Sequence, residues 1–145
     1  MAIWQFDLFM VHAEDDLPVM EEEGWTLPRL PAASTLRAQD TLIEVLGRPW
    51  LMLDDWIVFG EENGTRVDLV FDDADHVEIR MRLDVSATNR ALDAICRFAV
   101  ALNGRFFDPV TRTLLQPDRS TLASALAGSR AAAFTHASQA GLPSL

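Results

Sequence analysis

Alternating hydrophobic and polar residues predict a three-stranded antiparallel meander between positions 55 and 85. Residues 77–85 alternate without a break, apolar at odd positions and polar at even positions, as in a strand with one buried face. Upstream, residues 56–71 contain Asn63-Gly64, a pair that favours the two-residue turn of a β-hairpin. We therefore expect a hairpin followed by a third strand.

The turn at Asn63-Gly64 also predicts which residues face each other. The expected cross-strand pairs are Glu61 with Arg66, Val58 with Leu69 and Trp56 with Phe71, which places an apolar set on one face. With the next turn at residues 73–75, Phe71 faces Val77 and Asp68 faces Arg80. Arg66, Arg80 and Arg82 then lie on the outer face with acidic residues between them. Opposite charges are expected to pair there, Glu61 with Arg66 and Asp68 with Arg80.

Weaker patterns predict one further strand and a helix before the meander. Residues 3–11 alternate imperfectly, as in a strand that is buried on much of both faces and joins the same sheet. Ser34 or Thr35 is a candidate N-cap for a helix that runs to Leu46 and ends at Gly47 and Pro49.

Two more helices are expected after the meander. From Ser86, apolar residues at helical spacing predict a helix with Gly104 just past its end. Residues 105–108 and 111–115 suggest two short extended pieces around a turn. Asp118 or Ser120 then begins an Ala-rich helix that includes Phe134.

Together these elements predict a single α+β domain over residues 1–145. We expect an antiparallel sheet of four to six strands centred on the 55–85 meander, with two or three helices mainly on one face. Residues 13–33 are interpreted as an acidic loop and residues 141–145 as a frayed tail.

Charge is segregated along the chain, and all twelve positive side chains are arginines. Residues 1–78 hold eighteen Asp/Glu and four Arg, and residues 79–145 hold four Asp/Glu and eight Arg, so the balance is −14 and then +4, or −10 in total. A pI near 4.5 argues against nucleic acid and anionic membranes as partners. The first twelve residues lack a basic start and contain Gln5 and Asp7, so we expect no signal peptide and a cytoplasmic protein.

The segment 13–33 is the main candidate for a binding site. It contains two acidic runs, three prolines and Trp25, and loops of this length are uncommon in small domains. Either it is a solvated loop that Trp25 pins to the body, or it is a binding arm with an aromatic anchor among carboxylates. The burial of Trp25 distinguishes the two. The candidate partner-binding residues are Glu14, Asp15, Asp16, Glu21, Glu22, Glu23, Trp25, Asp54, Asp55, Glu61 and Glu62.

Catalytic motifs give little support for an enzyme. The run Asp72 to Asp75 lacks the glycine and terminal Glu of a calcium loop, so a polar hairpin turn is the simpler interpretation. His76-Val77-Glu78 matches part of the zinc-deaminase motif, but the chain has only one cysteine, Cys96, which is expected to be a small buried group. No cofactor, metal ligands or catalytic residues are assigned.

The chain resembles the small acidic α+β proteins that bacteria use as immunity partners of toxins. The resemblance rests on size, acidity and the hairpin around Gly60-Glu61-Glu62-Asn63-Gly64, and no residue role is carried over from it. It implies a non-enzymatic protein that binds and occludes a basic partner. Two alternatives stay open: a small enzyme or ligand-binding protein with carboxylates in a cleft between sheet and helices, and a structural homodimer.

Overall fold

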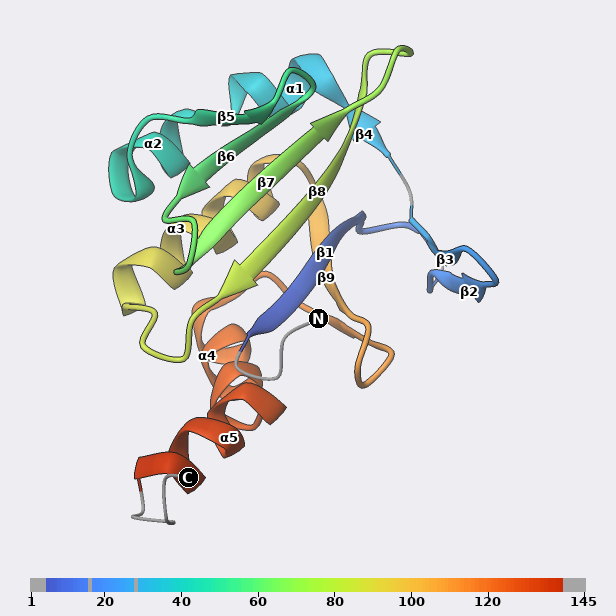
Figure 1. Ribbon diagram of the computed structural model, residues 1–145. Helices are drawn as coiled ribbons and strands as arrows, with labels where there is room; N and C mark the ends of the chain where they lie inside the picture. Colours follow the sequence, from blue (N-terminus) through green and yellow to red (C-terminus); the bar gives the residue numbers. More distant parts are fainter. Residues whose placement is uncertain (1–4, 16, 28, 140–145) are drawn as a thin grey trace.

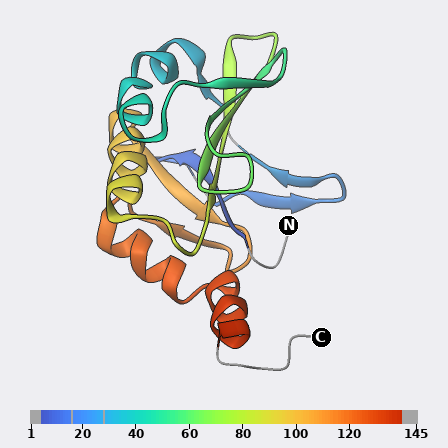
Figure 2. The same ribbon diagram turned by 60° about the vertical axis from the view of Figure 1, so that its left-hand side comes forward.

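The computed structural model describes residues 5–15, 17–27 and 29–139, which form one α+β domain. An eight-stranded antiparallel sheet carries helices on one face, and a separate two-stranded hairpin projects on the opposite side (Figures 1 and 2). The predicted class is confirmed. The sheet has more strands than the expected four to six, and five helices are present where two or three were expected.

The strand order in the sheet is β10-β9-β1-β8-β7-β6-β5, with β4 pairing β8 beyond the end of β1. The strands are β1 (Phe6–His12), β2 (Val19–Glu21), β3 (Gly24–Thr26), β4 (Leu30–Pro31), β5 (Trp50–Leu53), β6 (Trp56–Gly60), β7 (Arg66–Phe71), β8 (His76–Leu83), β9 (Gly104–Asp108) and β10 (Thr113–Leu115). The helices are α1 (Ala32–Arg37), α2 (Asp40–Leu46), α3 (Asn89–Ala101), α4 (Arg119–Ala127) and α5 (Arg130–Gln139).

The predicted meander is present as β6, β7 and β8, but the register of its first hairpin is wrong by one residue. Gly60 pairs with Arg66 and Trp56 with Val70, so the connection spans residues 61–65 and is longer than the expected two-residue turn. Gly60 takes a positive φ of 105°, where an added Cβ would lie 2.3 Å from the Thr65 carbonyl oxygen. Because strand side chains alternate, this slip moves Trp56 to the face opposite the core.

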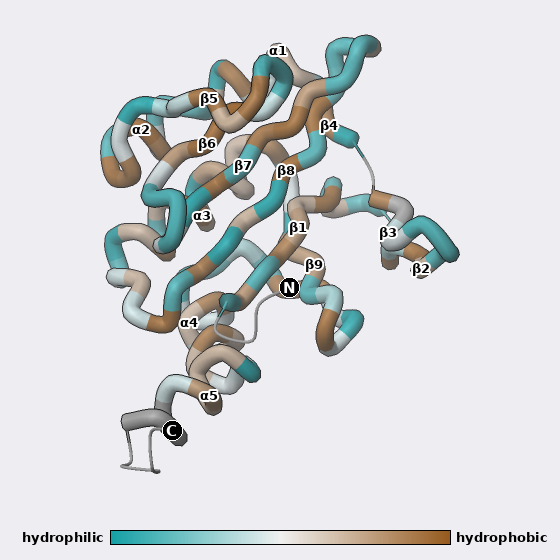
Figure 3. Tube along the Cα trace, viewed as in Figure 1, coloured by the Kyte–Doolittle hydropathy of each residue, from teal (hydrophilic) through white to brown (hydrophobic). Residues whose placement is uncertain are grey.

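The second hairpin of the meander has the predicted register. Phe71 pairs with Val77 and Asp68 with Arg80. Along β8 the odd positions are buried and the even positions are not, and Figure 3 shows the same alternation of hydrophobic and hydrophilic residues. The predicted N-terminal strand is also in the sheet, where β1 lies between β8 and β9. Its expected first residues, 3 and 4, lie outside the described ranges.

The hydrophobic core fills the space between this sheet and the helices. Buried side chains of β1, β7, β8 and β9 meet those of α2, α3 and α4, with Leu8, Leu69, Ile79, Ile95 and Phe98 at 1% exposure or less. The opposite face carries the even positions of β8 and is called the open face below (Figure 2).

Helix boundaries differ from the predictions in three places. The expected helix from Ser34 or Thr35 to Leu46 begins earlier, at Ala32, and divides into α1 and α2, although Gly47 does end it. The Ala-rich helix begins after Asp118 as expected, but it breaks at Gly128-Ser129 into α4 and α5.

Gly104 is the third difference. It does not follow α3 as a cap but begins β9, while Asn103 takes the left-handed conformation at φ 51°. An added Cβ at Gly104 would lie 3.0 Å from the Met10 side chain, so a larger residue here would force that side chain to shift.

The expected acidic loop of residues 13–33 contains three strands and the start of α1. Residues 17–27, called the arm, include the β2–β3 hairpin, whose turn contains Glu22 and Glu23. The strand β5 was also not predicted. Asp16 and the expected frayed tail, 141–145, lie outside the described residues.

Candidate functional site

A cluster of charged side chains lies at the centre of the open face. It consists of Asp7 on β1, Arg66 and Asp68 on β7, and Arg80 and Arg82 on β8, and is called the central cluster. The register brings them together, because Asp7 pairs with Arg82, Arg82 with Arg66, and Arg80 with Asp68. Residues paired in an antiparallel sheet point to the same face, so all five side chains share one surface.

Arg66 and Asp68 form a buried ion pair within this cluster. The Arg66 Nη2 atom is 2.9 Å from Asp68 Oδ2, and each side chain is only 6% exposed. The Trp56 indole N–H donates to the same oxygen at 3.0 Å, and Arg66 Nη1 donates to the Glu62 carbonyl at 2.9 Å. Asp68 Oδ1 has no hydrogen-bond partner among the described residues. A buried acceptor left in this state costs about 1–3 kcal/mol.

The other two arginines of the cluster are paired differently from the prediction. Arg80 faces Asp68 as expected but forms its ion pair with Glu78, and its guanidinium lies 6.0 Å from the centre of the Trp56 ring. Arg82 Nε donates to Asp7 Oδ1 at 3.2 Å. The expected ion pairs of Asp68 with Arg80 and of Glu61 with Arg66 are therefore wrong. Asp68 and Arg80 do face each other, but they pair with Arg66 and Glu78, and the shifted first hairpin places Gly60, not Glu61, opposite Arg66.

A pocket of about 230 Å³ opens between these side chains. The five residues of the central cluster line it together with Phe9, Trp56, Leu8 and Met81. The outer position of the arginines follows from β8 alternation, and sequence reasoning placed them correctly. It did not place Asp7 and Trp56 in this site. The position of Asp7 depends on the pairing of β1 with β8, and that of Trp56 depends on the shifted register of the β6–β7 hairpin.

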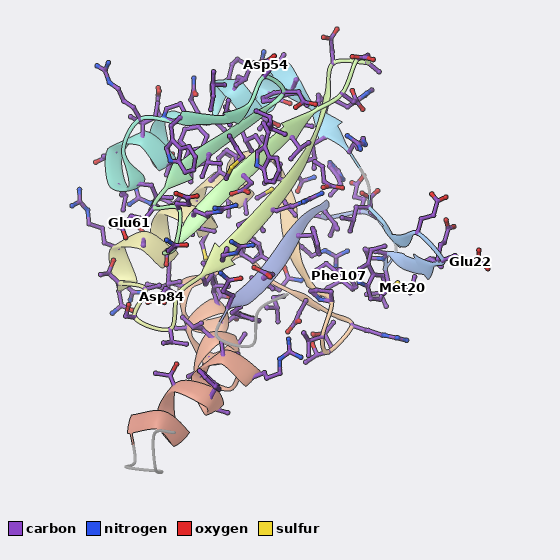
Figure 4. All side chains as sticks on the ribbon, viewed as in Figure 1. Met20, Glu22, Asp54, Glu61, Asp84 and Phe107 are labelled. Carbon is purple, nitrogen blue, oxygen red and sulfur yellow. The ribbon has the colours of Figure 1, made fainter. Side chains whose placement is uncertain are left out.

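The predicted acidic residues occupy separate parts of the molecule. Asp54 and Asp55 form the turn between β5 and β6, whereas Glu61 and Glu62 follow the other end of β6, about 20 Å away at the usual rise of a strand. Glu21, Glu22 and Glu23 on the arm form the third group. In Figure 4, Asp54, Glu61 and Glu22 lie at three different margins of the fold. The structure therefore does not join them into one continuous surface.

The arm is anchored to the sheet through Trp25. Its ring packs against Phe107 of β9 with centroids 4.9 Å apart in a T-shaped arrangement, and the Arg112 guanidinium lies 5.6 Å from its centre. Arg105 Nη2 donates to the Asp15 carbonyl at the base of the arm at 3.1 Å. Trp25 is half-buried and holds the arm in place, as expected for a loop that Trp25 pins to the body.

The arm carries exposed apolar and acidic side chains close together in its sequence, on both faces of the β2–β3 hairpin. Leu17, Val19 and Met20 are 51%, 61% and 49% exposed, and Glu21 to Glu23 are exposed beside them. Figure 3 shows the hydrophilic tip next to these apolar residues. Large apolar side chains left in solvent beside charges are typical of interaction surfaces.

Asp108 and Asp72 accept backbone hydrogen bonds in turns. A pocket of about 450 Å³ beside α4 and α5 is lined by Asp7 and Asp108. Asp108 Oδ1 accepts the backbone N–H groups of Val110 and Thr111, which fixes the β9–β10 turn. Asp72 Oδ1 likewise accepts the N–H groups of Ala74 and His76, and the His76 hydrogen bond lowers the pKa of Asp72 below 3.8. The Asp72–Asp75 run therefore forms a hydrogen-bonded hairpin turn.

In the described part of the chain, Cys96 is buried and no cluster of metal-ligating side chains is found. Cys96 is 4% exposed on α3, and burial raises the pKa of its thiol to about 12, with smaller effects from Asp118 and Asp93. No group of three or more His, Cys, Asp or Glu side chains is placed to hold a metal ion within residues 5–15, 17–27 and 29–139. In the same ranges, every helix is too short or too polar to cross a membrane.

Comparisons with known proteins add no relative to this description. No protein-family model matches the chain, and no match was found among curated proteins or solved structures.

Proposed function

We propose that this chain is a non-enzymatic interaction protein whose arm binds a basic partner protein. The observation that carries the proposal is the arm itself, which projects from the domain and presents Leu17, Val19 and Met20 beside Glu21 to Glu23 (Figures 1 and 4). The proposed contact surface is the exposed part of the arm around these residues, on both faces of the hairpin. Trp25 packs on Phe107, so it anchors the arm, and the proposal relies on the exposed side chains in place of the aromatic contact that the binding-arm interpretation expected.

The composition of this surface fits a charged interface. Apolar side chains that lose their solvent on binding supply affinity, while the surrounding carboxylates steer a basic surface toward them and reject acidic ones. The anchored hairpin also reduces the cost of ordering the arm on binding, because Trp25 and Arg105 already hold it. Four other predicted residues, Asp54, Asp55, Glu61 and Glu62, lie elsewhere and are not part of this proposed contact. Glu14 and Asp15 precede the arm and are not part of it either, and Asp16 lies outside the described residues.

Affinity capture from the native cells, at low and at high salt, tests the proposal. We expect a basic protein that is retained at low salt and released at high salt, since screening weakens exposed charge pairs. Reversing Glu21, Glu22 and Glu23 to Lys should abolish its capture.

The matched control reverses Asp54, Asp55 and Glu61 to Lys. Both triple variants change the net charge from −10 to −4, so only the position of the charge differs. Capture lost equally in both variants would indicate a general charge effect, and capture retained by the arm variant would refute the arm as the binding site. A Val19→Ser and Met20→Ser variant should weaken capture at both salt concentrations, because the apolar contact is not screened.

A second candidate, a structural homodimer, is favoured by one observation at the sheet edge. β5 is the last strand on its side, and it presents Leu51 and Leu53 at 65% and 60% exposure. A partner strand could pair with this edge and cover both leucines. Sedimentation would then report a dimer whose mass does not change with salt, and Leu51→Lys would convert it to a monomer.

A further inference from the structure

We propose that the pocket at the centre of the open face binds a small organic anion that carries a hydroxyl group near its acidic group. This site is distinct from the arm and does not depend on the arm's proposed partner. The pocket lining contains Arg66, Arg80 and Arg82 against Asp7 and Asp68, and Glu78, which pairs with Arg80, brings this group of side chains to neutrality in a chain of net charge −10. Anion recognition here therefore depends on individual guanidinium N–H groups and not on a net positive charge.

Arg80 and Arg82 are the groups that would hold the anion. Their side chains are 46% and 32% exposed, in contrast to the 6% of Arg66. Each is oriented through its Nε atom, Arg80 by Glu78 and Arg82 by Asp7. The terminal nitrogens of both guanidinium groups have no hydrogen-bond partner in the described part of the chain and can donate to a carboxylate or phosphate, which arginine binds through paired N–H groups.

Asp68 supplies the second half of the recognition. Its Oδ2 atom is occupied by Arg66 and Trp56, while Oδ1 is buried and has no donor among residues that the structure describes. The arginine directly across the strands, Arg80, is engaged by Glu78 instead. A ligand hydroxyl that donates to Oδ1 would satisfy this acceptor, and a ligand without a hydroxyl would leave it unsatisfied.

The size and walls of the pocket restrict the ligand further. A volume of about 230 Å³ is below the range typical of drug-sized ligands and suits a small metabolite. Phe9 and Trp56 contribute apolar surface beside the charged groups, which a short carbon chain can contact. The expected class is therefore a short hydroxylated carboxylate or phosphate, with the anion on Arg80 and Arg82 and the hydroxyl on Asp68.

Matched probe pairs test this assignment by calorimetry. 3-Hydroxybutyrate and butyrate share a carboxylate and differ only in the hydroxyl, and propane-1,2-diol 1-phosphate and propyl phosphate make the equivalent comparison for a phosphate. In at least one pair we expect the hydroxylated probe to bind about tenfold more tightly, as a hydrogen bond to a charged acceptor implies. The pair that shows this difference identifies the anion. The Trp56 indole N–H resonance should shift on binding, because it donates to the same carboxylate.

Variants separate the pocket from general charge effects. Replacing Arg80 and Arg82 by Gln should reduce the affinity at least about tenfold. The control replaces Arg90 and Arg97, exposed on α3, by Gln; both doubles have a net charge of −12, and the control should bind as the wild type does. Asp68→Asn should remove the preference for the hydroxylated probe, and the arginine variants keep the test decisive if that variant does not fold.

Three results would overturn the proposal. The first is the absence of binding by all four probes at concentrations up to about 10 mM, because a dissociation constant above this value is too weak for a specific ligand site. The second is equal affinity within both pairs, which would show that Asp68 Oδ1 takes no part. The third is unchanged binding by the Arg80 and Arg82 variant.

Discussion

The buried pair of Arg66 and Asp68 predicts strong energetic coupling. Each side chain is 6% exposed, so replacing Arg66 by Met leaves a buried carboxylate whose remaining donor is the Trp56 indole. Replacing Asp68 by Leu leaves a buried guanidinium with the Glu62 carbonyl as its remaining partner. Breaking a buried ion pair from one side costs about 3–5 kcal/mol. We expect each single variant to lose about 3 kcal/mol of unfolding free energy, at the lower end of this range.

The double variant should be far less damaging than the sum of the singles. With both charges gone, no ion is left unpaired, and such replacements are often neutral or stabilising. The Trp56 N–H loses its acceptor, which costs about 1–3 kcal/mol. A net loss of about 1 kcal/mol, against about 3 kcal/mol for each single variant, then implies a coupling energy of about 5 kcal/mol.

Urea denaturation followed by tryptophan fluorescence and circular dichroism measures this cycle. The control is the same cycle on Asp93 and Arg97, an exposed i,i+4 pair on α3 with side chains 40% and 62% exposed, where coupling should be about 0.3–0.5 kcal/mol. A coupling at Arg66 and Asp68 no larger than in this control would refute the inference that burial controls the energetics of the central cluster.

Three further predictions concern the arm, the lone thiol and a helix cap. Trp25→Ala should remove the contact with Phe107, worth about 0.5–1.5 kcal/mol beyond burial, and should speed proteolysis and hydrogen exchange in residues 17–27 while the rest of the domain keeps its protection. Cys96 should not react with Ellman's reagent at pH 8 until the protein unfolds, because burial raises its pKa to about 12; rapid reaction of the native protein would contradict its position. Hydrogen bonds led by the Thr121 hydroxyl lower the pKa of Asp118 below 3.8, so the stability lost in Asp118→Ala should be greatest above that pH and should disappear as pH falls through the folded-state pKa; a loss that persisted in acid would contradict this.

The meander shows what the sequence determines and what it does not. Strict alternation in β8 identifies its buried face, because a strand with one solvated face must alternate. The register of the β6–β7 hairpin depends on the turn, and Asn63-Gly64 is a common turn pair that this chain does not use as a two-residue turn. The positive φ of Gly60 and the longer connection shift the pairing by one residue. That small change decides whether Trp56 belongs to the core or to the pocket.

The arm and the pocket depend on contacts that no local pattern contains. All three residues of β2 are exposed, so they show no buried periodicity from which to predict a strand. Trp25 finds Phe107, which lies far along the chain, and the strand pairing that joins Asp7 and Arg82 spans 75 positions. Sequence reasoning could list the acidic residues, but their separation on three margins of the fold depends on the topology.

The charge segregation along the chain has a different form in the folded domain. Strand β1 comes from the acidic part of the sequence and lies between β8 and β9, which hold Arg80, Arg82 and Arg105. This insertion places Asp7 against Arg82, while Asp68 pairs with Arg66 and Glu78 with Arg80, so each of the three arginines in these pairs has one carboxylate partner. Within the described residues, no arginine-bearing strand lies beside the β5–β6 turn or the arm tip in this way, and the carboxylates there stay exposed. The proposed basic partner and the proposed anion would therefore bind at different places, and salt should weaken both interactions without one competing with the other.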